Sequence, residues 1–530
     1  MNTSTSVLWQ LIQSMTRSEK LFFKRKSIDT GSTASPLYMK LFDVIVSQKE
    51  YNEEAILKKL SPKITKKNIA FQKHYLHNQL NENLIEYNNR NSIEQEIYKN
   101  IQLIRINRKK GLLNAALALW EKTINRARKV ELFSMVQLLK KEFEKMILFS
   151  SVQVKYDELH TLFRSNIMSY DEYAEMITFR DLYTEILMLR RKAHFDFDDD
   201  LKNDIIHLSD KVNKRKMGLE SRSFWYRHYS RMCHATLSYL SYDTASSLPL
   251  IQDAIKDWWE HKGFMETDTE HYIELLYMVN YAGVMHGAYD YVNFVFNHKA
   301  NDLIKDEVQK ANFEAVKYLA LNKVYNKTAR YGEVAKLVEN MKTKYTNWEP
   351  LLNAELNRTV CFSLGIACFV LDNHTESLQF IKRGVTYFKD GTREEQFIFA
   401  NLFLLLILYN MNNAKLFDAQ YKSTYAYFYK KGRPHKLSPR GKVHSFEKIL
   451  MHCFHDTFYL TSFNEKNALF QKSIDALNAT RDSDVQKQTM NIFNFHGWLL
   501  SQAQRISYKE YVKRKYLTEA NPEKKQAIVL

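Results

Sequence analysis

Residues 364–384 read LGIACFVLDNHTESLQFIKRG, and the fold prediction rests on this stretch. It holds two apolar segments at helical spacing, each with a small residue where two helices would touch. Gly365 in the first segment is followed after 12 residues by Ser377, after 4 more by Ile381 and after 3 more by Gly384. Small residues let two helices approach closely, and the large Ile381 fills the gap against the next pair. The stretch therefore predicts a helical hairpin.

The same offsets recur elsewhere in the chain. Ala235, Ser247, Ile251 and Ala254 repeat the full pattern, and partial copies give second-helix motifs that start at residues 116, 247, 292, 335, 377, 419 and 468. From residue 247 onward the intervals are 45, 43, 42, 42 and 49 residues. Weaker candidate motifs at Leu159 and Ile205 fall in the longer interval between residues 116 and 247. A near-constant period in this range is typical of a solenoid, here of about nine hairpins over residues 93–505.

The composition agrees with a purely helical chain. The 530 residues include only 13 Gly and 7 Pro, whereas average usage would give roughly 60 of the two together. Sheet proteins need these residues in tight turns, and alternating α/β folds use glycine heavily in their strand-to-helix turns. We therefore predict an all-α, right-handed superhelix of antiparallel helical hairpins.

At this point the sequence resembles the tetratricopeptide-repeat superfamily. Leu364, Gly365 and Cys368, followed by Ser377, Ile381 and Gly384, fall on the Leu-Gly, Tyr, Ala, Phe and Ala positions of that repeat. Three of these residues depart from the usual types, the inter-repeat proline is absent, and the period exceeds 34 residues. The resemblance implies a divergent member with longer helices, or a HEAT-like array. Residues 15–24 and 126–133 also look like a group of Bacteroidetes helical-repeat proteins.

The positive charge lies at the two ends of the chain. Residues 1–150 have a net charge of +12, residues 151–400 of −5 and residues 401–530 of +10, which sum to the total of +17. We divide the chain into a basic helical cap (1–92), the repeat array (93–505) and a basic tail (506–530). The cap is expected to contain a capping box at Thr16 and Glu19. Three further helices are predicted in the cap, over residues 37–48, 53–60 and 65–87. They could form a helix-turn-helix or winged-helix variant that binds DNA, or an ordinary three-helix cap on the end of the array.

No motif for catalysis, a cofactor or a metal is found. The sequence has no phosphate loop, no G-x-G-x-x-G, no H-E-x-x-H and no C-x-x-C. The four cysteines are expected to be buried, reduced thiols, and the pair His452 and His455 to be a core or surface pair. The N-terminus lacks the pattern of a secretory signal, and the most apolar run, residues 397–409, is too short to span a membrane. We expect a cytoplasmic, non-enzymatic protein without cofactors.

Two clusters of aromatic and basic residues are the binding-site candidates, although the rings could instead pack between hairpins. By resemblance to tetratricopeptide arrays, the first helices line a concave groove, which would bind a protein or peptide through aromatic walls and Arg or Lys contacts to carboxylates. We predict a protein-interaction scaffold, with a nucleic-acid-associated or regulatory protein that uses the basic N-terminal segment as the alternative. The candidate residues are Arg227, Tyr229, Arg231, Tyr239, Tyr277 and Tyr281 in the first cluster and Lys430, Lys431 and Arg433 in the second.

Overall fold

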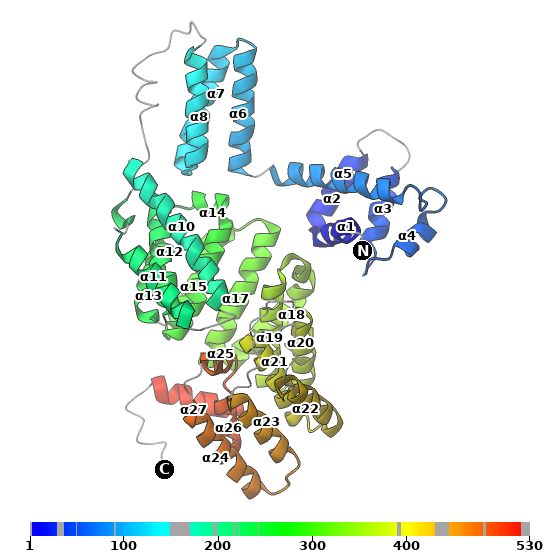
Figure 1. The fold of residues 1–530 in the computed structure, drawn as a ribbon, viewed down its shortest axis with the longest axis vertical. Helices are drawn as coiled ribbons and strands as arrows, with labels where there is room; N and C mark the ends of the chain where they lie inside the picture. Colours follow the sequence, from blue (N-terminus) through cyan, green and yellow to red (C-terminus); the bar gives the residue numbers. More distant parts are fainter. Residues whose placement is uncertain are drawn as a thin grey trace.

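The chain folds into helices joined mostly by short turns. A computed structural model describes residues 3–28, 36–48, 50–89, 92–148, 170–193, 199–215, 218–221, 223–241, 243–388, 394–429, 445–480 and 484–520. Within these ranges there is no strand, which confirms the predicted all-α class. Figure 1 shows a small group of blue N-terminal helices beside a long succession of helices that runs from cyan to red.

The N-terminal module has a hydrophobic core of its own, which includes Phe23 and Phe42. The predicted capping box is present: the Thr16 amide donates to Glu19 Oε2 at 2.8 Å, and the Glu19 amide donates to Thr16 Oγ1 at 3.1 Å. The module comprises α1 (Thr3–Ser14), α2 (Arg17–Ile28), α3 (Leu37–Val46), α4 (Glu53–Leu60) and α5 (Ile69–Asn89).

The module differs from the sequence-based expectation in two places. The sequence analysis assigned no element before Thr16, whereas the structure has α1 there, packed on the end of α3, where Trp9 Nε1 donates to the Gln48 carbonyl at 3.4 Å. Helix α5 begins four residues later than the predicted start at Thr65. The reason is a hydrogen-bonded turn, because the Thr65 amide donates to Asn68 Oδ1 at 2.8 Å and Asn68 Nδ2 donates to the Lys63 carbonyl at 3.1 Å.

The remaining described helices form the repeat array, in which most helices pack against a helix that is close in the sequence. Short 3₁₀ segments, η1 (Gly218–Glu220), η2 (Lys299–Leu303) and η3 (Glu349–Leu351), precede α12, α17 and α19. The weak repeat candidate Leu159 lies outside the described residues. The helices of the array are α6 (Ile93–Lys109), α7 (Leu113–Lys129), α8 (Phe133–Leu148), α10 (Tyr170–Ala193), α11 (Asp199–Asn213), α12 (Phe224–Leu240), α13 (Thr244–Glu260), α14 (Gly263–Thr267), α15 (Thr269–Met285), α16 (Tyr289–Phe296), α17 (Glu307–Lys327), α18 (Tyr331–Trp348), α19 (Ala354–Val370), α20 (His374–Thr386), α21 (Glu394–Asn410), α22 (Ala414–Tyr429), α23 (Ser445–Phe458), α24 (Phe463–Ala479), α25 (Asp484–Ile492), α26 (Phe495–Ala503) and α27 (Tyr508–Ala520).

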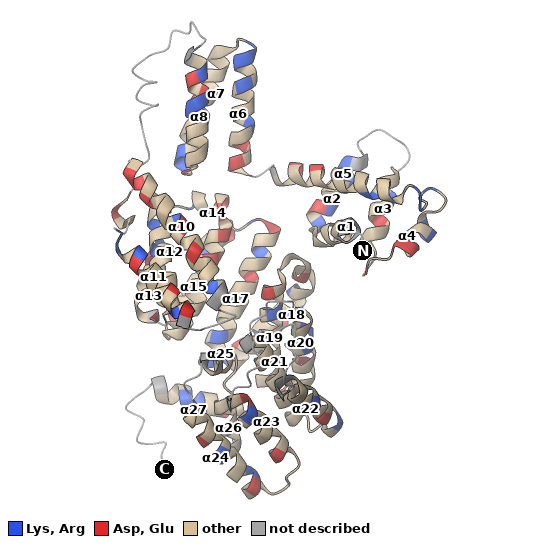
Figure 2. Cartoon of the chain, viewed as in Figure 1, with Lys and Arg blue, Asp and Glu red and all other residues tan. Residues whose placement is uncertain are grey.

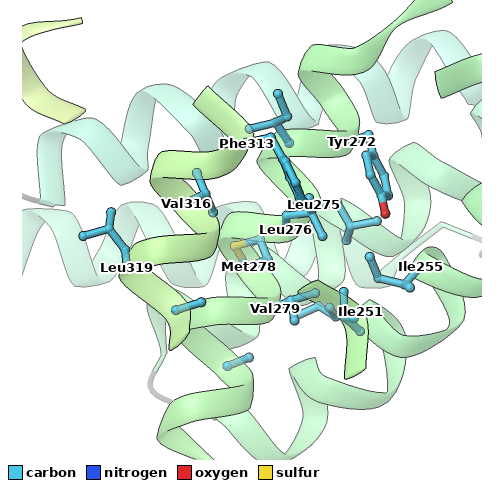
Figure 3. Close-up of a cluster of buried hydrophobic side chains, with 14 of the residues drawn as sticks. Ile251, Ile255, Tyr272, Leu275, Leu276, Met278, Val279, Phe313, Val316 and Leu319 are labelled. Carbon is cyan, nitrogen blue, oxygen red and sulfur yellow. The ribbon is translucent and has the colours of Figure 1, made fainter. Parts of the chain in front are cut away.

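Within the described residues, the core of the array consists of three hydrophobic clusters, one in α6–α8, one that extends from α10 to α19 and one from α19 to α26. Figure 3 shows one part of it, where side chains from α13, α15 and α17 meet. Ile251 from α13, Leu276 from α15 and Val316 from α17 are fully buried there. Because each helix packs on both its hairpin partner and the next hairpin, the first helices are apolar on most sides. Burial of this kind is the main stabilising contribution to such a fold.

The hairpin α19–α20 has the close approach that the sequence predicts. Ser377 Oγ donates to the Gly365 carbonyl at 2.7 Å, across the offset of 12 residues. A Cβ atom on Gly365 would lie 2.5 Å from Ile381 Cδ1, and one on Gly384 would lie 2.6 Å from the Phe362 ring. The small residues are therefore needed where the two helices touch.

The turns explain why so little glycine is needed. Several hairpins end their first helix on a residue in the left-handed region, and this residue is Gly111 or Gly287 in only two of them. The backbone closes the turn by itself, as when the Asn373 amide donates to the Cys368 carbonyl at 2.8 Å. The other left-handed residues, with φ between 50° and 64°, are Glu131, Ala329, Asp372, Asn412 and Arg505.

One of these turns makes a direct prediction about stability. Ala329 has φ of 54°, where a Cβ atom is strained and glycine is not. Ala329→Gly is expected to raise the free energy of unfolding by about 1 kcal/mol. Ala468→Gly, at an exposed position inside α24, is the matched control and should lower it by about 1 kcal/mol. Chemical denaturation measures both, and a destabilised Ala329→Gly variant would contradict the prediction.

A buried carboxylate joins the α6–α8 helices to the next part of the array. Glu131, in the turn between α7 and α8, accepts hydrogen bonds from the amides of Phe224 and Trp225 at 2.9 and 3.2 Å and from Ser223 Oγ at 2.8 Å. These donors form the N-terminus of α12, where amide groups lack partners within the helix and a negative charge is favoured. Burial nevertheless raises the pKa of Glu131, against the lowering effect of these hydrogen bonds.

Part of the expected basic tail is an ordered helix. Residues 508–520 form α27, which packs against α26. Lys509 Nζ lies 2.6 Å from Asp372 Oδ2 in the α19–α20 turn, and Tyr331 Oη donates to the Lys509 carbonyl at 3.2 Å. Helix α27 therefore folds back onto α18 and the turn between α19 and α20.

Candidate binding face

Arg227 and Arg231 share one carboxylate inside the α12–α13 hairpin. Arg227 Nε and Nη2 donate to the two oxygens of Asp257 at 2.8 and 2.7 Å, and Arg231 Nη1 donates at 2.6 Å. All three side chains are largely buried. Burial opposes the ionisation of Asp257, but the two guanidinium groups outweigh it and hold its pKa below the usual value. The structure thus places these two arginines in an internal network.

Tyr229 lies inside the array rather than on an open face. Its side chain is only 9% exposed, and its ring stacks on Trp225 with centroids 5.5 Å apart. On the other side the ring meets the edge of His271 at 5.8 Å. Since Tyr229 is four residues from Trp225 on α12, both rings fill the space against α15. The sequence-based expectation that Tyr229 points into the groove is not what the structure shows.

Tyr239, Tyr277 and Tyr281 come together on the neighbouring first helices α12 and α15. The rings of Tyr239 and Tyr281 meet edge to face, with centroids 4.7 Å apart. Tyr277 lies one helical turn before Tyr281, and Met285 lies one turn after it. Tyr281 is 38% exposed and Met285 44% exposed, whereas Tyr239 and Tyr277 are half-buried. We call Tyr239, Tyr277, Tyr281 and Met285, together with Lys323 described next, the tyrosine face.

Charged groups lie close to the tyrosine face. Lys323 on α17 is exposed, and its Nζ lies 5.3 Å from the centre of the Tyr281 ring, a cation–π contact. Arg190 of α10 lies near Tyr239 and donates to Glu274 Oε1 at 2.5 Å. Burial lowers the pKa of Arg190, but Glu274 outweighs it and raises this pKa above its usual value. The face therefore offers aromatic rings beside an exposed lysine and a partly buried ion pair.

Only part of the second predicted cluster lies within the residues that the structure describes. Lys430, Lys431 and Arg433 lie outside the described residues. On the preceding helix α22 the ring of Tyr421 stacks on His455 of α23, with centroids 4.4 Å apart, and Tyr425 is 44% exposed.

The described residues contain one group of side chains that could hold a metal ion. Asp257, Glu260 and His261 bring their ligand atoms within 4.8 Å of one another. The Asp257 oxygens already accept four hydrogen bonds or ion pairs from Arg227, Arg231 and His261. The guanidinium groups stand where a cation would bind, so this donor set does not fit a metal.

The four cysteines are buried and free, as the sequence predicts. Burial raises the pKa of Cys361 to about 11 and those of Cys368 and Cys453 to about 12. A thiol with such a pKa holds its proton at neutral pH and is a poor nucleophile. Among the described helices, none combines the length and the apolar character that crossing a membrane requires.

The comparisons with known proteins concern the architecture. No protein-family model matches the chain, and no curated protein matches it. Among solved structures, the crystal structure of Rap protein complexed with competence and sporulation factor is similar, with a TM-score of 0.40 and 13% sequence identity. The match covers 77% of the present chain and 97% of the Rap chain. This similarity identifies neither a ligand nor a site in the present protein.

Proposed function

We propose that this chain is a non-enzymatic helical-repeat scaffold that binds a peptide or protein segment across the tyrosine face. The observation that carries the proposal is the edge-to-face contact of the exposed Tyr281 with the half-buried Tyr239, with Lys323 beside it. Tyrosine provides a large contact area at a small entropic cost, and it is enriched at the centres of protein interfaces. An array of helices offers such a surface over several repeats without a deep pocket.

The charges suggest the chemistry of the segment. Lys323 is an exposed cation on the face, and Glu274 is paired with Arg190. A bound segment would place apolar side chains over Tyr277, Tyr281 and Met285 and a carboxylate near Lys323. An acidic residue next to a short apolar run is therefore the expected motif.

Selection from a displayed library of random peptides tests the proposal. Enriched peptides should carry this motif, and Tyr281→Ala should weaken their binding about tenfold or more in fluorescence anisotropy. Lys323→Glu should remove the preference for an acidic residue. Tyr425→Ala on α22 is the matched control, because this tyrosine is similarly exposed and lies outside the face. If no peptide is enriched, or if both tyrosine variants lose the same affinity, the proposal fails.

A further inference from the structure

A run of exposed lysines surrounds the turn between α4 and α5 in the N-terminal module. Residues 55–81 contain six lysines and no acidic residue. Figure 2 shows blue segments at the end of α4 and in the turn, at the outer edge of the module in this view. Five of the six lysines have exposed side chains, and we call them the lysine surface: Lys58, Lys59, Lys63, Lys66 and Lys67.

Three acidic groups of the module are paired with cations outside this surface. Glu53 pairs with the sixth lysine, Lys73, whose ammonium also lies over the Tyr51 ring. Asp43 pairs with Lys24 at 2.6 Å, and Glu86 pairs with Lys26. Within the described part of the module, the five lysines of the surface have no ion-pair partner. Their charges are therefore available to an anionic ligand.

The backbone that carries these lysines is fixed. Ile64 is fully buried in the core of the module, and the side chain of Asn68 bridges the Thr65 amide and the Lys63 carbonyl. The turn is thus held at its centre and at its junction with α5. A ligand that bound here would order side chains but not the backbone, which lowers the entropic cost of binding.

An exposed aromatic ring follows the lysines closely in the sequence. Phe71, about one helical turn after Lys67, is 66% exposed. Tyr75, one turn further along, is partly exposed and packs edge to face against Tyr38 at 5.3 Å. Lysines along a surface with an open aromatic ring among them are the combination with which proteins bind unpaired nucleotides. The lysines attract phosphates, and a base stacks on the ring.

We propose that the lysine surface binds single-stranded nucleic acid, with the lysines at the phosphates and Phe71 stacked on a base. Duplex nucleic acid would satisfy the lysines, but its bases are stacked on one another and leave no face for Phe71. An acidic peptide would also meet the lysines, yet it has no planar base for the ring. This site is separate from the tyrosine face, since it lies on a different module.

Binding of the full chain to labelled single-stranded oligothymidylate tests the proposal. If five phosphates are neutralised, affinity should fall about 100-fold between roughly 50 and 200 mM salt. Replacing all five lysines of the surface with glutamine should abolish binding even at low salt. The matched control replaces five exposed lysines elsewhere, Lys122, Lys305, Lys310, Lys382 and Lys472, and has the same net charge. It should keep most of the affinity.

Phe71→Ala tests the ring. It should weaken binding to the single strand about tenfold and leave the melting temperature unchanged, whereas Phe71→Tyr should bind normally. Tighter binding to a duplex, equal competition by polyglutamate, or equal losses in the two five-lysine variants would each overturn the proposal. Tyr281→Ala should not affect nucleic-acid binding, so failure here is distinguishable from failure of the peptide proposal.

Discussion

Replacing Asp257 with alanine is expected to lower the free energy of unfolding by about 4 kcal/mol. The change leaves Arg227 and Arg231 without the carboxylate that accepts three of their hydrogen bonds at 2.6 to 2.8 Å. Both guanidinium groups are largely buried, so water replaces the lost partner poorly. Trp225 and Trp258 lie in the same hairpin, and their fluorescence during chemical denaturation reports its unfolding.

Two further variants separate the charge network from general damage to α13. Glu260→Ala removes an exposed carboxylate from the same helix end and should change the stability by less than about 0.5 kcal/mol. Replacing Arg227 and Arg231 with methionine and Asp257 with leucine together should recover most of the loss, because no buried charge is then left unpaired. A loss below about 1 kcal/mol for Asp257→Ala would contradict this account.

The second large effect is expected at Glu131. Glu131→Gly removes the carboxylate and leaves the amides of Phe224 and Trp225 and the Ser223 hydroxyl without their acceptor. The expected loss is about 3 kcal/mol. Glycine is the most demanding substitution for this test. It tolerates the left-handed φ of 50° better than glutamate does, so its effect on the backbone of the turn opposes the loss caused by removing the carboxylate.

Hydrogen exchange gives a local measurement of this effect. The amides at the N-terminus of α12 should exchange about 100-fold faster in Glu131→Gly, since 1.4 kcal/mol corresponds to a factor of ten. Glu144→Ala removes an exposed carboxylate from α8 and should leave these amides unchanged. Unchanged exchange in Glu131→Gly would show that the carboxylate does not hold α12.

The hairpins could be predicted because their determinants are local. Gly365, Ser377 and Gly384 lie within 20 residues of one another, and their spacing alone shows which helix surfaces touch. The same holds for the capping box at Thr16, where both partners lie within one turn. The start of α5 was misplaced because the competing turn depends on the side chain of Asn68 rather than on the apolar pattern.

The candidate site was only partly predictable. The pattern assigned Tyr239 and Tyr281 to the first helices of successive hairpins, and in the structure their rings meet with centroids 4.7 Å apart, but their role in binding stays a prediction. It did not show that Arg227 and Arg231 are held by Asp257 on the second helix, since the same residue types also suit a binding surface. The role of Glu131 depends on contacts 92 to 94 residues away, which no local pattern encodes.

The return of α27 to α18 and the α19–α20 turn has a mechanical consequence. In an array where each unit contacts only its neighbours, tension applied at one end unfolds the hairpins one at a time from that end. Here the contacts of Lys509 with Asp372 and Tyr331 connect residues 137 and 178 positions apart. These contacts connect α27 directly to α18 and to the α19–α20 turn. Under tension they must break before α26 and the helices that precede it can unfold.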